Sequence, residues 1–588
     1  MTDTKQSRLT ATLLCVTPPD EHQEQGIRAF LQKKYGEDVA LTIQQDTSLK
    51  SGFQLHVGSE VYDWSAKGRM EQFRQQVEQL VAKNTRKGII PLLRSSIDEF
   101  RLLAKSSEVG TVKSIGDGIA VVEGLEHAAY GEILMFDNGI KGMVQDLRRN
   151  ETGCILFDNA DDISAGSKVA RTGKTAGVPV GDAFLGRVVD ALGRPIDGGD
   201  AIPADGYRPV EEPAPGIIDR QSVDTPMETG LLSIDAMFPI GRGQRELIIG
   251  DRQTGKTAIA LDAMLNQKGK NVICVYVAIG QKASSVAQLV ENLRKRDAMD
   301  YCVVVSATAG EADTMQYIAP YAGCAMAEYY MHKGCDVLIV YDDLSKHAIA
   351  YRAMSLLLER APGREAYPGD VFYLHSRLLE RSAHLSDKLG GGSMTALPIV
   401  ETQAGDVSAY IPTNIISITD GQIFLESDLF FAGQRPAVNV GLSVSRVGGA
   451  AQTKATKKAT GSLRLDLAQY REMEVFTQFS SDLDDSTKEQ LHYGQGLMRI
   501  LRQKQYHPLS MHQQVIVLVC AMGHVLSKVA VKDVTDFRDA LLDHFEQEHS
   551  DLCRSLEDEK VLTDDMKQEI LRIAEEYLAA NAERFRKE

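Results

Sequence analysis

The chain has 588 residues, enough for three to five domains of ordinary size. Its 65 Lys and Arg against 81 Asp and Glu give a net charge of −16, which argues against a nucleic-acid binder that relies on bulk positive charge. The eight scattered cysteines form no C-x-x-C pair, so the pattern indicates neither a zinc site nor a disulfide scaffold. The best apolar run, Val515–Cys520, falls far short of the roughly 20 residues that span a bilayer, and we expect any membrane contact to pass through partner subunits.

The N-terminal part, from about residue 9 to residue 83, is predicted to be a small α/β unit. Apolar and polar residues alternate over 39–43 and over 53–57, which predicts two strands. Apolar residues at helical spacing predict one helix over 70–80 and a second over 93–104.

Three further regions follow along the chain. Between about 108 and 175, short apolar segments are separated by frequent glycines, which is typical of a small β-barrel. From about 176 to 455, apolar strands alternate with helical patterns, as in a parallel-sheet α/β domain. After about 460 the pattern is helical. The predicted strands of the α/β domain are Leu247–Ile249, Val272–Ala278, Cys302–Val305 and Val337–Tyr341.

The strongest chemical signal is a phosphate-binding loop. Gly250-Asp251-Arg252-Gln253-Thr254-Gly255-Lys256-Thr257 fits G-x-x-x-x-G-K-[ST], follows the predicted strand Glu246–Ile249 and opens a predicted helix over Ala258–Asn266. Glycines allow backbone N–H groups to surround phosphates, and the helix N-terminus favours their charge. We expect Lys256 to reach the β- and γ-phosphates and Thr257 to hold Mg²⁺.

Two other segments bear on this interpretation. A second Gly-Lys-Thr at Gly173–Thr175 has Lys168 where the first loop glycine should stand and lacks a strand-to-helix context, so we reject it as a phosphate site. An apolar run over 336–341 leads directly into Asp342, which is predicted to orient Mg²⁺ through its water shell.

Four segments around the loop together resemble the α subunit of F-type ATP synthases, and the resemblance extends over roughly residues 105 to 588. They are Pro239–Glu246, Tyr276–Lys282, Ile411–Asn414 and Gly441–Gly448.

This resemblance implies an alternating αβ hexamer around a rotating shaft, in which the β subunits do the chemistry and α binds a nucleotide that it does not turn over. Gln281 stands where the β subunit carries its catalytic glutamate. An amide cannot act as a general base, whose loss typically costs about 10²–10⁴ in rate. On residue type alone, Gln281 is also compatible with a polar residue that merely ends a strand.

The resemblance also implies functional residues outside the phosphate loop. Arg446 is expected to act in trans as an arginine finger in the neighbouring β subunit, and Ser443 to shape the same interface. Without the resemblance, a lone Arg at a strand end is most often a solvated or paired surface residue. The full predicted nucleotide site is Gly250, Asp251, Arg252, Gln253, Thr254, Gly255, Lys256, Thr257, Gln281, Phe430, Arg435, Pro436, Gln503 and Gln505, with Thr257 and Asp342 at the metal.

The N-terminal unit has a resemblance of its own. Asp46–Phe53, Val57–Asp63, Ser65 and Gly68-Arg69 resemble the C-terminal domain of the δ subunit, which ties the hexamer to the peripheral stalk. The chain is therefore interpreted as a δ–α fusion that carries its own stalk-docking module, with an unrelated α/β cap as the alternative.

The resulting fold class is multidomain α/β: a small α/β N-terminal unit, a β-barrel, a RecA-type P-loop nucleotide-binding domain and a C-terminal helical domain. The expected boundaries are 1–85 for the δ-like domain, 86–107 for a helical linker, 108–175 for the barrel, 176–458 for the nucleotide-binding domain and 459–588 for the helical domain.

The expected function is that of an α-type, non-catalytic subunit of a rotary ATP synthase driven by protons or sodium ions, with ATP or ADP and Mg²⁺ as cofactors. Expected partners are β subunits, the γ rotor and a b-type stalk subunit, without nucleic acid, at the cytoplasmic face of a bacterial or archaeal plasma membrane. A self-sufficient homohexameric export-type ATPase is the main alternative, and Gln281 argues against it. An RNA-translocating hexamer resembling the Rho factor is disfavoured by the net charge and the single Trp64. A pure scaffold conflicts with the intact phosphate loop.

Overall fold

The computed structural model describes residues 10–19, 21–35, 39–58, 60–68, 70, 106–137, 139–157, 163–477 and 485–585. The chain divides into two compact units, Met1–Ala176 and Gly177–Glu588. Apart from Met70, the predicted helices over 70–80 and 93–104 lie outside the described residues.

The first unit begins with a small α/β part of four strands, which belong to one ten-stranded sheet because β4 pairs with the first barrel strand, β5. Its strand order is β4-β3-β1-β2, in which β1 and β2 run parallel because α1 connects them, while β3 and β4 pair antiparallel. Leu31 of α1 packs with Leu13, Leu55 and Tyr62 in one buried cluster. The two strands predicted from alternation are confirmed as β2 and β3. The elements are β1 (Thr10–Cys15), α1 (Glu21–Tyr35), β2 (Ala40–Gln45), β3 (Phe53–Val57) and β4 (Glu60–Asp63).

The same unit contains the predicted β-barrel. Six antiparallel strands follow the order β10-β7-β8-β9-β6-β5, and pairing of β10 with β5 closes the ring. Inside the unit, Arg171 forms ion pairs with Glu108 and Glu132, both at 3.0 Å, so two buried carboxylates are compensated. The strands are β5 (Ser106–Gly116), β6 (Ile119–Glu123), β7 (Glu132–Phe136), β8 (Lys141–Leu147), β9 (Glu151–Leu156) and β10 (Lys168–Thr175).

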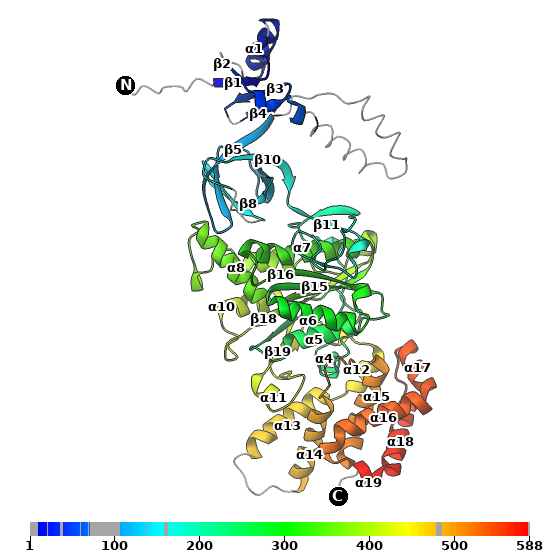
Figure 1. Cartoon of the computed structure of the whole chain (residues 1–588). Coiled ribbons are helices and arrows are strands. Elements are labelled where there is room, and N and C mark those ends of the chain that lie inside the picture. Colours follow the sequence, from blue (N-terminus) through cyan, green and yellow to red (C-terminus); the bar gives the residue numbers. More distant parts are fainter. Residues whose placement is uncertain are drawn as a thin grey trace. The chain divides into compact units, whose positions relative to one another are not determined.

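The second unit is built on an eight-stranded sheet of order β12-β16-β15-β17-β18-β14-β19-β20, parallel except for the antiparallel edge pair β19–β20. Figure 1 shows α7 and α8 on one face of the sheet and α5 and α6 on the other. The four predicted strands are confirmed as β14 to β17. The strands are β12 (Val188–Val189), β14 (Leu247–Gly250), β15 (Val272–Gln281), β16 (Cys302–Thr308), β17 (Asp336–Asp342), β18 (Ser393–Glu401), β19 (Gly421–Leu425) and β20 (Val444–Ser445), with β11 (Gly177–Val180) and β13 (Gly206–Pro209) as a separate pair.

Helices cover this sheet because buried central strands need both faces shielded from water. The 19-residue α7 is buried along nearly its whole length, and Tyr317 and Tyr321 on it pack around His347 of α8. The helices are α4 (Leu232–Met237), α5 (Lys256–Leu265), α6 (Ala283–Arg294), α7 (Asp313–Met331), α8 (Leu344–Leu357), α9 (Val371–Leu379), α10 (Tyr410–Ile418) and α11 (Ser427–Phe431).

The C-terminal part is helical, as predicted, and packs around α15. The apolar run Val515–Cys520 is buried within α15 and is therefore core rather than a membrane segment. Among the described residues, no helix is both long and apolar enough to cross a membrane. Buried Gln514 donates to Asp235 of α4 at 2.8 Å, which ties the helical part to the sheet domain. The helices are α12 (Lys454–Thr460), α13 (Leu463–Thr477), α14 (Asp485–Ile500), α15 (Met511–Met522), α16 (Val534–Glu548), α17 (Ser550–Glu559), α18 (Asp564–Ala580) and α19 (Ala582–Phe585).

Candidate nucleotide-binding site

The phosphate loop lies between β14 and α5, in the strand-loop-helix context that the motif predicts. Gly255, directly before α5, has φ +95°, a conformation that a residue with a Cβ rarely adopts, so the loop requires glycine here. Lys256 donates from Nζ to the backbone oxygen of Gly250 at 2.9 Å. Burial lowers the pKa of its ammonium, despite the nearby carboxylates of Asp342 and Asp343. The lysine thus lies along the loop, where it can reach a phosphate.

The Asp251 carboxylate holds the loop in shape. It accepts hydrogen bonds from the Thr402 hydroxyl at 2.6 Å, the Gly405 N–H at 2.9 Å and the Ser427 hydroxyl at 3.0 Å. Burial opposes the charged form, but these donors hold the pKa of Asp251 below its ordinary value. Asp251 therefore remains charged and fixes the phosphate loop to Thr402, Gly405 and Ser427.

Four polar side chains meet near the carboxyl ends of β15 and β17. Gln281 and Asp342 end these two strands, Tyr276 lies within β15 and Thr257 lies in the first turn of α5. The Asp342 carboxylate, 3% exposed, accepts from the Thr257 hydroxyl at 2.7 Å and from the Tyr276 hydroxyl at 2.5 Å. Gln281 donates from Nε2 to the other Asp342 oxygen at 2.9 Å. A hydroxyl and a carboxylate side by side are the hard oxygen donors that suit Mg²⁺. Tyr276 was not among the predicted site residues, although it opens a segment that carried the resemblance.

A cavity of about 660 Å³ extends from the loop toward the helical part. This volume is typical of a small-molecule site. The Arg435 guanidinium stacks over the Phe430 ring, 4.4 Å from its centroid, and forms a flat wall. The predicted residues that line the cavity are Gln253, Thr254, Gly255, Lys256, Thr257, Phe430, Arg435, Pro436, Gln503 and Gln505.

The two predicted glutamines differ in their surroundings. The Gln503 amide accepts from Leu232 N–H at 3.1 Å and donates to the backbone oxygens of Gly230 at 2.7 Å and His507 at 3.0 Å. It therefore braces the cavity wall. Gln505 lines this cavity and also a neighbouring cavity of about 290 Å³ that contains Gln281 and Asp342.

Three loop residues and two interface residues lie outside the lining of both cavities. Gly250 and Asp251 form the base of the loop, and Arg252 is exposed and pairs with Glu401. Arg502 also lines the larger cavity; only its position next to Gln503 could have indicated it.

Ser443 and Arg446 flank β20 at the edge of the eight-stranded sheet. Ser443 is fully buried, and its hydroxyl accepts from the Phe424 N–H at 3.0 Å, which joins β20 to β19. Arg446 donates its backbone N–H to Asp420 O at 2.9 Å and is exposed. At the same sheet edge, therefore, the buried Ser443 hydroxyl stabilises the strand pairing, whereas the charged side chain of Arg446 is exposed.

Fold and site together define a P-loop nucleotide-binding protein with a β-barrel before its parallel sheet and a helical domain after it. Family models match the chain as "ATP synthase delta (OSCP) subunit" over 1–77, "ATP synthase alpha/beta family, beta-barrel domain" over 105–173, the nucleotide-binding domain of the same family over 230–445 and its C-terminal domain over 452–577. The ATP synthase subunit alpha of Clostridium botulinum strain Hall is 58% identical over 482 residues, 82% of this chain and 96% of that protein. That of Clostridium kluyveri strain NBRC 12016 is 56% identical over 489 residues, 83% and 97% of the two chains.

The chain belongs to the alpha subunits of F-type ATP synthase and carries an N-terminal delta (OSCP) domain, that is, a delta–alpha fusion. The predicted resemblance, the fold class and the non-catalytic alpha role are confirmed. The individual site residues and the domain boundaries remain predictions.

Proposed function

We propose that this alpha subunit binds MgATP or MgADP in the cavity beside the phosphate loop and does not hydrolyse it. The observation that carries the proposal is the contact of Gln281 with Asp342, at 2.9 Å. The phosphates would lie on the loop N–H groups and Lys256, and the base against Arg435 and Pro436. Mg²⁺ would be held by the Thr257 hydroxyl and, through water, by Asp342, and would neutralise phosphate charge.

The chemistry of Gln281 supports binding without turnover. Its amide nitrogen is a donor toward Asp342, so this side chain orients the metal-side carboxylate instead of accepting a proton from water. Within the described residues that line the 290 Å³ cavity, Asp342 is the one carboxylate, and it is occupied by Thr257, Tyr276 and Gln281. This arrangement disfavours a self-sufficient motor.

Arg446 is proposed to serve the catalytic site of an adjacent beta subunit. Its exposure at the sheet edge supports a role outside its own cavity, since neither of the two described cavities includes it. An arginine supplied in trans stabilises charge on the transferred phosphoryl group and is worth about 10³–10⁵ in turnover. Ser443 is proposed to hold β20 in register for this contact.

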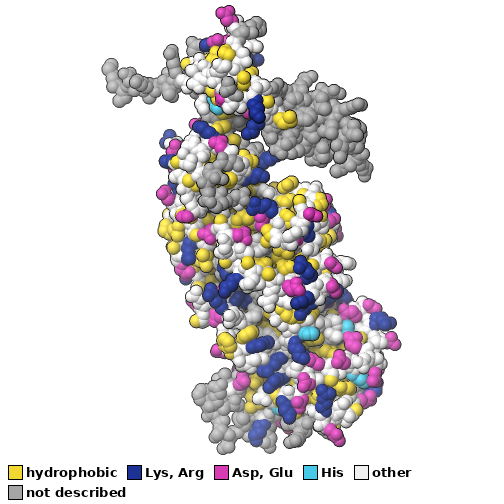
Figure 2. Space-filling view, viewed as in Figure 1, with side chains coloured by type: hydrophobic (Ala, Val, Ile, Leu, Met, Phe, Trp, Pro, Cys, Tyr) yellow, Lys and Arg dark blue, Asp and Glu magenta, His cyan; other side chains and the backbone are white. Residues whose placement is uncertain are grey.

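The N-terminal unit is proposed to dock a b-type peripheral stalk subunit, because its match to the delta (OSCP) model covers residues 1–77. The other proposed partners are beta subunits and the gamma rotor, at the cytoplasmic face of the membrane and without nucleic acid. Figure 2 shows Lys and Arg interspersed with Asp and Glu over the visible face of the nucleotide-binding and helical parts, which agrees with the net charge.

The arginine assignment is tested in a complex reconstituted with beta and gamma subunits. Arg446→Ala should lower steady-state ATPase by about 10³-fold or more and leave nucleotide binding by the alpha subunit unchanged. The matched control is Arg572→Ala, which removes an exposed arginine that pairs with Glu576 on α18. Turnover that stays at the control level in the Arg446 variant would contradict the proposal.

A further inference from the structure

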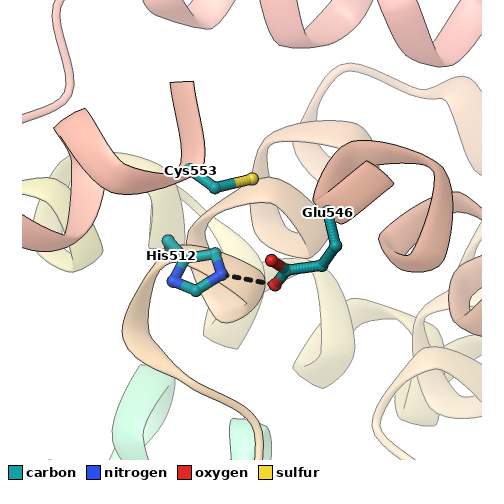
Figure 3. A group of neighbouring side chains, drawn as sticks. All are labelled: His512, Glu546 and Cys553. Carbon is teal, nitrogen blue, oxygen red and sulfur yellow. Dashed lines mark hydrogen bonds and ion pairs between the residues drawn. The ribbon is translucent and has the colours of Figure 1, made fainter. Parts of the chain in front are cut away.

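Three potential metal ligands from three helices converge in the helical domain, away from the nucleotide cavity. His512 lies in the first turn of α15, Glu546 in the last turn of α16 and Cys553 in the first half of α17. Their ligand atoms all lie within 4.8 Å of one another. Figure 3 shows the three side chains pointing toward a common space, with His512 Nε2 and Glu546 in contact at 2.7 Å.

From this convergence we propose that His512 Nε2, a Glu546 oxygen and Cys553 Sγ bind one zinc-class divalent cation. A mixed nitrogen, oxygen and sulfur set suits Zn²⁺ or Co²⁺ and is too soft for Mg²⁺ or Ca²⁺. A tetrahedral zinc site spaces such ligand atoms by about 3.3–3.8 Å. The imidazole and the carboxylate, now 2.7 Å apart, need to separate by about half an ångström, and the thiol needs to approach by at most about one ångström, which side-chain rotation can supply.

Two further side chains, Glu557 and Gln513, orient the ligands of this cluster and support the assignment. Glu557 of α17 accepts from His512 Nδ1 at 2.8 Å, the carboxylate–histidine arrangement that orients an imidazole so that Nε2 faces a metal. Gln513 donates to the same Glu546 oxygen at 3.0 Å and orients that carboxylate. Both oriented ligands thus have a partner that would remain in place after binding.

Charge and access also fit a bound cation. One thiolate and one carboxylate balance a charge of 2+, and the proton now on Nε2 and the thiol proton both leave to solvent. Glu546 is 43% exposed, whereas Cys553 is buried, so a cation could enter from the Glu546 side, and water would complete its coordination there. The bound cation would join α15, α16 and α17. The sequence pattern did not indicate it, because the ligands are not closely spaced along the chain.

The test uses the untagged, reduced, nucleotide-free full chain with excess Mg²⁺, titrated with Co²⁺ and followed by absorption. We expect one equivalent to produce tetrahedral cobalt bands and a thiolate-to-cobalt charge-transfer band that Zn²⁺ removes. Cys553→Ala should abolish the charge-transfer band, and His512→Gln should weaken Co²⁺ binding at least tenfold.

Two controls make this test specific. Cys335→Ala removes the one cysteine that is not buried, all eight being in the described part, and should leave the band unchanged. His549→Asn disrupts the neighbouring His544, Glu548 and His549 group and should also leave it unchanged.

A second variant keeps the zinc-site proposal testable. If Cys553→Ala does not fold, Glu546→Gln at the half-exposed position replaces it and must weaken binding, and Zn²⁺ must raise the unfolding temperature of the wild type more than that of this variant. No thiolate band, a band that survives in the Cys553 variant, or Co²⁺ binding by the His512 variant as tight as that of the wild type would overturn the proposal. The cluster would then be a histidine held between two carboxylates.

Discussion

The Asp342 carboxylate at the end of β17 receives hydrogen bonds from Thr257, Tyr276 and Gln281. Tyr276 and Gln281 both belong to β15, the strand beside β17, and Thr257 lies in the first turn of α5. Because these contacts converge on Asp342, the choice between glutamine and glutamate at position 281 changes the chemistry around this carboxylate. A glutamate at the position of Gln281 would face Asp342 with like charge in the metal-free chain, whereas the amide donates to it. In the proposed function, the residue that replaces the general base is therefore also the one that orients the carboxylate proposed to face the metal.

Lys256→Ala should weaken MgATP binding by about tenfold to a hundredfold, since a hydrogen bond to a charged group contributes about 1.5–3 kcal/mol. Calorimetric titration of nucleotide-free protein measures the change. The matched control is Lys174→Ala in the second Gly-Lys-Thr, which lies in strand β10 and should bind normally. Equal losses in both variants would show that the phosphate loop is not the site.

Two buried histidines, His347 and His375, should make the stability of the fold depend on pH. Their ring centroids are 5.4 Å apart. Burial lowers the pKa of His375 to about 3, and burial together with His375 lowers that of His347. Both rings stay neutral in the fold while the unfolded chain takes up protons below pH 6.5. Stability is therefore lost as pH falls from about 6.5, by about 1.4 kcal/mol per pH unit for each histidine.

The contribution of His375 is isolated by comparing denaturant unfolding of the wild type and His375→Leu between pH 7 and pH 5. We expect the difference in stability between them to shift in favour of the variant as pH falls. The comparison is needed because burial raises the pKa of Asp262 to about 6, and this group takes up a proton in the fold. A difference independent of pH would contradict the assignment.

At the scale of elements, α7 is tied to the segment after α9 by a buried ion pair. Arg381, 1% exposed, contacts Glu328 through two hydrogen bonds at 2.7 and 2.8 Å. Arg381→Leu should destabilise the sheet domain by about 3–5 kcal/mol, because it leaves a buried carboxylate with Arg208 alone at 3.4 Å. Thermal unfolding measures the loss of stability. A loss as small as that caused by Arg572→Ala would contradict a stabilising role of the buried ion pair.

Local sequence predicted those elements whose pattern is short-range. β14 and α5 follow from an apolar run, a glycine-rich loop and a helix start, and all lie within about twenty residues. The side of the cavity proposed for the adenine combines Phe430, Arg435 and Gln505 with that loop, and only the resemblance indicated these three residues. Periodicity carries no information on contacts between such distant segments. Likewise, the sequence did not predict that the Gln503 amide forms its hydrogen bonds with the backbone of Gly230, Leu232 and His507.

At the scale of the whole molecule, the delta-type domain fused to this alpha subunit is proposed to attach the stalk. If the alpha copies alternate with beta subunits in a hexamer, each copy would bring one such module, so several stalks would attach or some modules would stay empty. Deletion of residues 1–85 should release the b-type stalk and leave assembly and ATPase of the soluble hexamer intact. Co-purification measures both, with deletion of residues 1–9, which removes no described strand, as control. Stalk retention by the longer deletion would refute the docking role.

Whether this chain binds nucleotide without turning it over is decided by measuring MgATP turnover of the purified chain, with bound nucleotide quantified in the same sample. We expect bound nucleotide in the wild type, less of it in Lys256→Ala and no turnover in either. Robust turnover by the wild type that Lys256→Ala abolishes would contradict this expectation. Gln281 would then not disable the site, and a self-sufficient motor would be the better description.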